Sequence, residues 1–412
     1  MKKELTPEDV SGYLRWVITD KGARIIDCDR TFEGAMAIPS ALDGVPVVEI
    51  GNMAFSNRHS LKSVAIPDSV EVVGEYAFAG CVALAELSLG AGIKKIEKRA
   101  FHGCFSLKSV EIPGTVESVG EDAFTICIRL EELQLGAGIK RIEEGAFRWC
   151  DSLKSVVIPD SVEVVGEAAF AECHGLQELR FGTGIKTIEN GTFAKCFSLQ
   201  SVAIPDSVEV VGERAFAWCY ELKELRLGRG IKKIEKCAFR KCSSLQSVVI
   251  PGSVEVVGEG AFSECTELEE LQLGAGFKKI ERLTFFRCSS LKSVEVPDSV
   301  EVVGEAAFGE CDGLNELRLG RGIKKIEKYA FCWCDSLQSV VIPGSVEVVG
   351  EDAFRACSEL EDLQLEAGIK KIEKGAFQWC DSLELVFIPG SVEVVGEGAF
   401  DESVCLVVND ER

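Results

Sequence analysis

The chain has 412 residues and a formal net charge of −22, from 45 Lys and Arg residues against 67 Asp and Glu residues. This acidity argues against nucleic acid and anionic membranes as partners, because both bind faces rich in lysine and arginine. No apolar run approaches the ~18 residues of a membrane span, so we expect no membrane insertion.

The first residues, 1–31, are predicted to form an N-terminal β-hairpin cap. Two apolar segments, residues 13–18 and 23–26, flank the sequence Thr19-Asp20-Lys21-Gly22, which is typical of a hairpin turn. Two lysines near the start are not followed by an apolar core, so we expect no secretory signal.

A repeat of 23 residues follows the cap. A phenylalanine recurs at this interval from Phe55 to Phe400, and neighbouring repeats differ enough to form 46-residue pairs. A fixed period of this length is typical of a solenoid, in which each repeat is one coil stacked on the next. We therefore predict a solenoid over residues 32–400 and a C-terminal cap over residues 401–412, with a closing strand at residues 404–408.

The spacing within a repeat predicts the shape of a coil. With Leu61 as place 1, places 1, 4 and 6 are apolar and indicate a short strand, and Pro or Gly at place 7 ends it. Places 10 and 13 are predicted to point inward. The segment Ala-Phe-x-x-Cys at places 17–21 is interpreted as a helical turn. One coil cannot fold alone, so stacking must supply its stability.

This repeat resembles that of the BspA-like leucine-rich repeat family. The resemblance is carried by the apolar places, the Pro-x-Ser turn and the end motif of one coil, namely Leu61, Val64, Ile66, Pro67, Ser69, Val70, Val73, Gly74, Ala77, Phe78 and Cys81. It implies an α/β-type repeat solenoid, a strand-rich right-handed superhelix with a parallel β-sheet and short helical turns. It also implies protein binding, often at the cell surface.

Two columns of equivalent residues have structural interpretations. Place 11 alternates between Glu and Lys, beginning with Glu71 and Lys94, which predicts ion pairs between neighbouring coils. Fourteen of the 18 cysteines lie at place 21. We interpret them as buried thiols rather than as a disulfide or metal array, because a line of residues offers no four ligands that converge on one ion. Free thiols favour a reducing or anoxic compartment, whereas the resemblance favours the cell surface.

Catalysis has little support in the sequence. The three histidines, His59, His102 and His174, lie in different coils, and the acidic residues at place 3, such as Glu86, are interpreted as a solvated face. We expect no catalytic residue, no cofactor and no metal.

The exposed places differ most between copies, notably places 5, 19, 20 and 22. Tryptophan and phenylalanine at these places are candidate anchors for a protein partner, because large aromatic side chains are enriched in interfaces. These candidates are Trp149, Trp218, Phe286, Trp333, Trp379 and Phe387. We expect the partner on the concave sheet or the adjoining tryptophan-bearing rim, weighted toward the C-terminal half.

The predicted function is therefore non-enzymatic protein binding, for example in adhesion or interaction with a host or cell surface. Two alternatives stay open. One is a carbohydrate-binding protein or enzyme that uses the exposed tryptophan rows, and the other is a structural or assembly protein.

Overall fold

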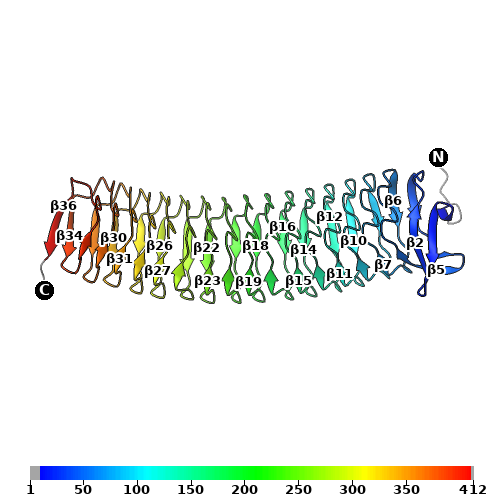
Figure 1. Cartoon of the computed structure of the whole chain (residues 1–412), viewed down its shortest axis with the longest axis horizontal. Coiled ribbons are helices and arrows are strands. Elements are labelled where there is room, and N and C mark those ends of the chain that lie inside the picture. Colours follow the sequence, from blue (N-terminus) through cyan, green and yellow to red (C-terminus); the bar gives the residue numbers. More distant parts are fainter. Residues whose placement is uncertain (1–9, 410–412) are drawn as a thin grey trace. The chain divides into compact units, whose positions relative to one another are not determined.

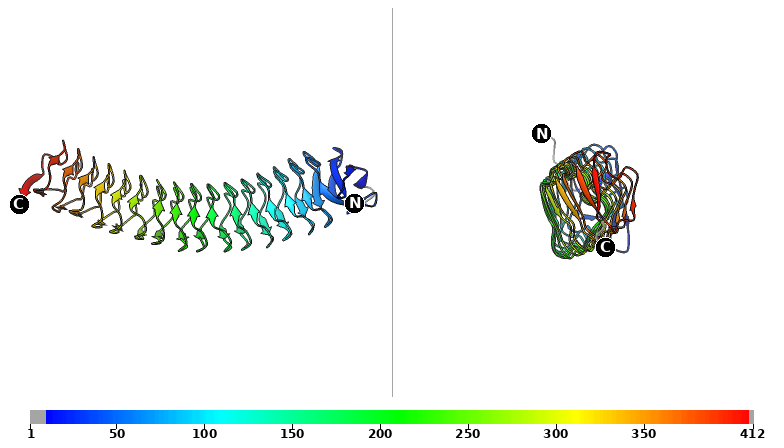
Figure 2. Two further views of the ribbon diagram at one scale, coloured as in Figure 1. Left: turned by 60° about the horizontal axis from the view of Figure 1, so that its bottom comes forward. Right: turned by 90° about the vertical axis from the view of Figure 1, so that its left-hand side faces the viewer.

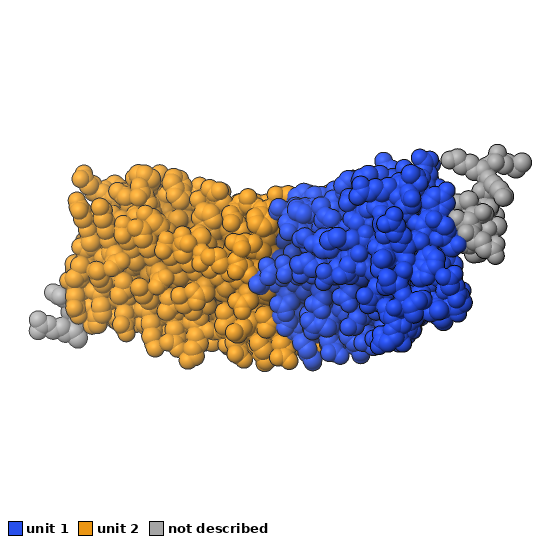
Figure 3. Space-filling view, turned by 45° about the vertical axis from the view of Figure 1, so that its right-hand side comes forward, with its two compact units in different colours: residues 1–202 blue, residues 203–412 orange. Residues whose placement is uncertain are grey.

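The computed structural model describes residues 10–409, and the chain divides into two compact units, Met1–Val202 and Ala203–Arg412 (Figure 3). Each unit is a stack of 23-residue coils, and most coils contribute two short strands (Figure 1). Figure 2 shows the successive coils of each unit side by side. Within the described residues, only Val10 and Ser11 have α-helical backbone.

The first unit begins with a hairpin and continues as regular coils. From β6 onward, even-numbered strands start a coil and odd-numbered strands follow its first turn. Its strands are β1 (Leu14–Ile18), β2 (Ala23–Cys28), β3 (Gly34–Ala37), β4 (Ala41–Leu42), β5 (Val45–Ile50), β6 (Leu61–Ala65), β7 (Val72–Val73), β8 (Glu86–Ser88), β9 (Lys95–Ile96), β10 (Ser109–Ile112), β11 (Ser118–Val119), β12 (Glu132–Leu135), β13 (Arg141–Ile142), β14 (Ser155–Val157), β15 (Val164–Val165), β16 (Glu178–Arg180), β17 (Thr187–Ile188) and β18 (Ser201–Ala203), the last of which spans the boundary between the units.

The second unit repeats the same pattern to the end of the described chain. Its strands are β19 (Val210–Val211), β20 (Glu224–Arg226), β21 (Lys233–Ile234), β22 (Ser247–Ile250), β23 (Val256–Val257), β24 (Glu270–Leu273), β25 (Lys279–Ile280), β26 (Ser293–Glu295), β27 (Val302–Val303), β28 (Glu316–Arg318), β29 (Lys325–Ile326), β30 (Ser339–Ile342), β31 (Val348–Val349), β32 (Asp362–Leu365), β33 (Lys371–Ile372), β34 (Leu385–Pro389), β35 (Val394–Val395) and β36 (Cys405–Asn409).

Strand pairing between coils is parallel and keeps the 23-residue offset. In unit 1, for example, Ser109 of β10 pairs with Glu132 of β12. In unit 2, Lys325 of β29 pairs with Val348 of β31. The same place of every coil within a unit therefore lies in one column. The chain is thus the strand-rich parallel solenoid that the period predicted.

The segment at places 16–21 is not a helical turn, and that part of the prediction is wrong. Its N–H groups alternate between two kinds of partner. The N–H of Phe78 donates to the carbonyl of Ala100 in the next coil at 2.7 Å, whereas the N–H of Cys81 donates to Phe78 at 3.2 Å. A helix would need every donor for its own chain segment. Left-handed backbone at places 16 and 20, as at Tyr76 (φ 54°) and Gly80 (φ 72°), interrupts helical geometry further.

The core of each unit is a column of parallel phenylalanine rings. Successive rings at place 18 lie between 4.7 Å (Phe55 to Phe78) and 5.7 Å (Phe262 to Phe285) apart, centroid to centroid, among the pairs within a unit. Place 13 is buried beside them, as at Val73. The inward places that the period predicted are therefore confirmed.

Charged columns pair as the alternation at place 11 predicted. Lys94 Nζ lies 3.0 Å from Glu71 Oε1, and Lys324 Nζ lies 3.2 Å from Glu301 Oε2. A second paired column at place 15 was not predicted, and there Lys98 lies 2.6 Å from Glu121. These exposed pairs each add at most about 1 kcal/mol, so they fix the register more than they stabilise the fold.

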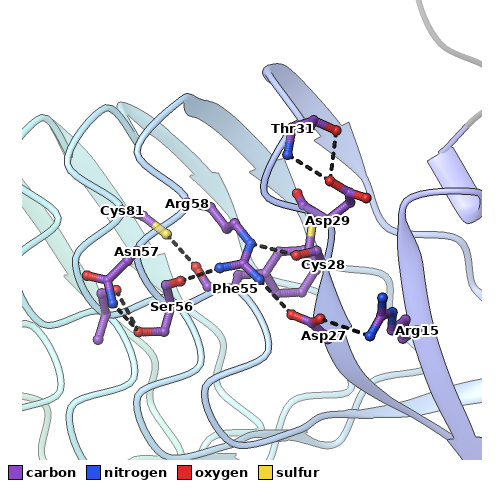
Figure 4. A network of polar contacts seen from close by, with 11 residues as sticks. Arg15, Asp27, Cys28, Asp29, Thr31, Phe55, Ser56, Asn57, Arg58 and Cys81 are labelled. Atoms are coloured by element: carbon purple, nitrogen blue, oxygen red, sulfur yellow. Dashed lines mark hydrogen bonds and ion pairs between the residues drawn. The ribbon is translucent and has the colours of Figure 1, made fainter.

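The hairpin is anchored to the first coil through a buried arginine (Figure 4). The predicted hairpin is present as β1 and β2, which pair antiparallel. Arg58 is at place 21, where the next fourteen coils have cysteine. Its guanidinium donates to the carbonyl of Cys28 at 2.6 Å, to that of Ser56 at 2.6 Å and to the carboxylate of Asp27 at 2.6 Å. Arg58 therefore ties the first coil to the cap.

The predicted closing strand is also present, because β36 pairs in parallel with β34. The boundaries of the cap at residues 1–31, of the solenoid at 32–400 and of the C-terminal cap at 401–412 stay predictions. Residues 1–9 and 410–412 of these caps lie outside the described residues.

Candidate functional site

Four of the six candidate residues lie at place 20 of a turn between strands. We call places 16–22 of the coils, residues 76–82 and their equivalents, the turn face. The tryptophans at place 20 all have left-handed backbone, with φ between 59° at Trp149 and 65° at Trp379. This conformation costs about 1–2 kcal/mol for a residue with a side chain. A hydrogen bond to the next coil offsets the cost, as when the Trp333 N–H donates to Arg355 at 2.8 Å.

Trp333 and Trp379 form an exposed pair on the turn face of unit 2. Their ring centroids are 6.2 Å apart at 69°, and the side chains are 46% and 45% exposed. They belong to coils separated by one intervening coil, so their backbones are about 9.6 Å apart. Place 20 of the intervening coil is Ala356, which is small and buried. The two rings can therefore lean together above it.

Phe387 lies on a different part of the last coil, on strand β34. It is 50% exposed and has Leu385 (44% exposed) on the same strand and Leu406 (43% exposed) on β36. Among the described residues, no ring contact joins it to either tryptophan of the pair. The structure thus brings two of the three predicted C-terminal anchors into contact, and leaves the third on the sheet.

The other three candidates are half-buried and have no ring contact with another candidate in the part of the chain that the structure describes. The guanidinium carbon of Arg148 lies 4.0 Å from the ring centroid of Trp149, and that of Arg287 lies 5.2 Å from Phe286. Trp218 lies on the turn face of unit 2. An arginine thus already covers one face of Trp149.

Acidic side chains surround the exposed tryptophan pair, and the sequence reasoning missed them. Asp312, Asp335 and Asp381 all lie at place 22, and Glu359 follows at place 23 of the intervening coil. Burial and the neighbouring charges of Asp335 and Glu310 raise the pKa of Asp312, while burial and Glu359 raise the pKa of Asp335. Reading place 22 as a column would have shown three aspartates within four coils.

The cysteine column is structural. The thiol of Cys150 donates to the carbonyl of Phe124 at 3.4 Å, and Cys173 donates to Phe147 at 3.3 Å. Burial raises the pKa of Cys173 to about 12 and keeps the thiol protonated. No disulfide forms within residues 10–409. The buried-thiol interpretation is thereby supported over a disulfide array.

The histidines offer no activated nucleophile. Nδ1 of His174 lies 3.0 Å from Asp151 Oδ1, and the His174 ring stacks on Phe197 at 4.5 Å. The adjacent Cys173 is buried with a raised pKa, which is the opposite of an activated thiol. Across the described range, no group of three or more His, Cys, Asp or Glu side chains is arranged to hold a metal ion.

Solved structures share the fold. A leucine-rich repeat protein from Bacteroides ovatus is 26% identical, with 97% of this chain and 98% of that chain covered and a TM-score of 0.76. A leucine-rich repeat protein from T. pallidum is 30% identical, covers 53% of this chain and 91% of its own, and has a TM-score of 0.41. No curated protein shows significant similarity to the chain.

Family membership follows from the repeats themselves. Between residues 10 and 409, the structure contains no helix long and apolar enough to cross a lipid bilayer. The model of the BspA type leucine rich repeat region matches residues 48–177, 164–292 and 278–407, which together span most of the chain. The chain belongs to the BspA-type leucine-rich repeat family.

Proposed function

We propose that this protein is a non-enzymatic binding protein that holds a protein partner on the turn face of unit 2. The exposed pair formed by Trp333 and Trp379 carries the proposal. Leucine-rich-repeat proteins generally mediate protein interactions, and adhesion to a host or cell surface is one form that this binding would take.

The energetics favour this pair as the anchor. Tryptophan buries a large apolar area at little cost in rotamer entropy, and truncation of an anchoring tryptophan commonly costs 2 kcal/mol or more of binding free energy. Trp333 and Trp379 present two adjoining rings with nearly half of each side chain exposed. Trp149 is half-buried under Arg148, so its ring offers less new contact.

Carbohydrate binding, the alternative, has less support at this surface. A sugar ring stacks on the flat face of an open aromatic ring. The two indoles lie at 69° to each other, and Arg355 occupies the space above Trp379, with its guanidinium carbon 4.0 Å from the ring centroid. A protein side chain that inserts between the rings fits this geometry better than a flat sugar.

The test compares two double variants of the full chain. Trp333→Ala with Trp379→Ala removes the pair, and Trp149→Ala with Trp218→Ala is the matched control, since all four residues share place 20. Alanine is compatible with this backbone, because Ala356 has φ 58° at the same place. Circular dichroism and thermal unfolding establish that both variants are folded.

Cross-linking capture from native cells, quantified by mass spectrometry, measures the outcome. We expect proteins captured by the wild-type chain to fall at least tenfold with the first variant and less than twofold with the control. Capture that is unchanged in a folded Trp333→Ala, Trp379→Ala variant would overturn the proposal.

A further inference from the structure

Two tryptophans of the turn face are each covered by an arginine that also meets a carboxylate. Arg148 lies 4.0 Å from the ring centroid of Trp149 and donates to Glu172 at 2.9 Å. Arg355 lies 4.0 Å from the ring centroid of Trp379, and its Nη1 lies 3.3 Å from Asp352 Oδ1. An arginine stacked on an indole and paired with a carboxylate gains from both contacts at once.

Trp333 has the ring and the carboxylates of this arrangement without the arginine. Arginines 148 and 355 are both at place 19. The place-19 residue of the Trp333 coil is Cys332, and that of the preceding coil is Gly309. Within the described residues, no cation lies over the Trp333 ring.

The carboxylates beside Trp333 are also without cations. Asp335 lies two residues after Trp333 in the same turn. The N–H of Glu359 donates to the carbonyl of Asp335 at 3.1 Å, and the N–H of Ser336 donates to that of Asp312 at 3.1 Å, which places these residues in adjacent coils. Between residues 10 and 409, Asp312, Asp335 and Glu359 take part in no salt bridge.

The carboxyl pKa values mark the same location. Hydrogen bonds from Lys324 and Lys278 lower the pKa of Glu301, as expected for a carboxylate in a paired column. Asp312 and Asp335 shift the other way, because burial is joined by repulsion from neighbouring carboxylates. A cation that docked between them would relieve this repulsion.

We infer that Trp333 is a receptor for an arginine side chain that a basic segment of the protein partner supplies. The guanidinium stacks on the exposed ring of Trp333 and pairs with Asp335 and Glu359, and this completes the arrangement that Arg148 and Arg355 form within the chain. This inference rests on the proposed function, because it names the chemistry of the partner that the tryptophan pair holds.

Arginine suits this surface better than lysine. Its planar guanidinium stacks on an indole and forms two parallel hydrogen bonds with a carboxylate, whereas the compact ammonium of lysine does neither. Trp379 then contributes apolar contact to the neighbouring residue of the same segment.

The probe is a fluorescein-labelled dodecapeptide of alternating arginine and leucine, and its matched control replaces arginine with citrulline, which has the same shape and no charge. Binding is measured by fluorescence anisotropy at 50 mM and 300 mM NaCl. We expect the arginine peptide to bind at least tenfold more tightly than the citrulline peptide and to weaken at the higher salt concentration.

Three variants of the full chain separate the site from general attraction to an acidic protein. Asp335→Asn with Glu359→Gln should weaken the arginine peptide at least tenfold. Glu132→Gln with Glu178→Gln removes the same charge from exposed positions on unit 1 and should change affinity less than twofold. Cys332→Arg places an arginine beside Trp333 from within the chain and should abolish binding, whereas Cys332→Ala should not.

Each other result overturns the inference. No binding of the arginine peptide, equal binding of both peptides, or equal losses from the two carboxylate variants would each exclude an arginine receptor at Trp333. The proposed function is tested separately. Partners lost with Trp333→Ala and Trp379→Ala but retained with Asp335→Asn, Glu359→Gln would keep the function and refute only the arginine chemistry.

Discussion

Replacement of Phe147 by alanine tests the phenylalanine column of unit 1 directly. The side chain is fully buried, and its ring stacks on Phe124 at 5.3 Å and on Phe170 at 5.1 Å, with interplanar angles of 3° and 8°. The variant therefore removes a core side chain and two ring contacts together.

The expected cost follows from these two losses. A buried Phe→Ala change costs about 3–5 kcal/mol through lost transfer free energy and the remaining cavity. A stacked pair adds about 0.5–1.5 kcal/mol beyond the buried area. Because Phe147 has two such partners, we expect a cost near the upper end, about 4–5 kcal/mol. Phe400 has one partner, Phe377 at 5.2 Å, and is 9% exposed, so Phe400→Ala should cost about 1–2 kcal/mol less.

Urea unfolding followed by circular dichroism measures the difference. Stacked repeats can unfold in stages, so amide hydrogen exchange is measured alongside to locate the loss. Exchange should rise first in strands β11 to β15, around the cavity. A cost below about 2 kcal/mol for Phe147→Ala, or one equal to that of Phe400→Ala, would refute the argument that stacking along the column stabilises the coils.

Three further predictions concern the thiols, the cap and the turns. Burial raises the pKa of Cys173 from 9.0 to about 12, so its contribution to stability is complete below pH 9 and declines as pH rises toward 12. Cys173→Ala should reduce the alkaline loss of unfolding free energy by about 1.4 kcal/mol per pH unit in that window, and an unchanged slope would contradict the burial. In the native chain at pH 8, a maleimide should label the exposed Cys405 first, as mass spectrometry would show. Arg58→Met should cost about 1–3 kcal/mol by leaving buried carbonyl groups unpaired, and faster hydrogen exchange should be confined to β1 and β2; unchanged exchange there would rule out its anchoring role. Gly138→Ala should destabilise by about 1–3 kcal/mol, because a Cβ would lie 1.8 Å from the Gly114 carbonyl oxygen. The control Gly114→Ala should stay within about 0.5 kcal/mol, since its nearest neighbour would be 3.7 Å away, and equal costs in urea unfolding would count against the clash.

The candidate site was predictable only in part. Exposed and variable places were visible because copies within one chain can be compared, and Trp333 and Trp379 were named on that ground. Their contact was not visible, because it depends on the small Ala356 between them and on the lean of two rings. The acidic neighbours at Asp312 and Asp335 were missed because place 22 was read one coil at a time.

The turn at places 16–21 shows why spacing can mislead. Ala-Phe-x-x-Cys has the three-residue interval of a helical face, and one segment considered alone favours that interpretation. The choice is made between coils. Every second N–H, such as that of Phe78, donates to the next coil, and a helix would have to give up those bonds. Nothing within the segment itself records that competition.

The sequence alone determined the period, the inward places and the parallel stacking. Apolar side chains must be buried, and a 23-residue recurrence from Phe55 to Phe400 leaves stacking as the way to bury them. Only the tertiary structure decided the details that depend on neighbouring coils. These are the non-helical turn, the thiol of each cysteine on a phenylalanine carbonyl, and the arginines that cover Trp149 and Trp379 but not Trp333. Such contacts join residues of different coils, and their energies depend on distances that a repeating pattern does not contain.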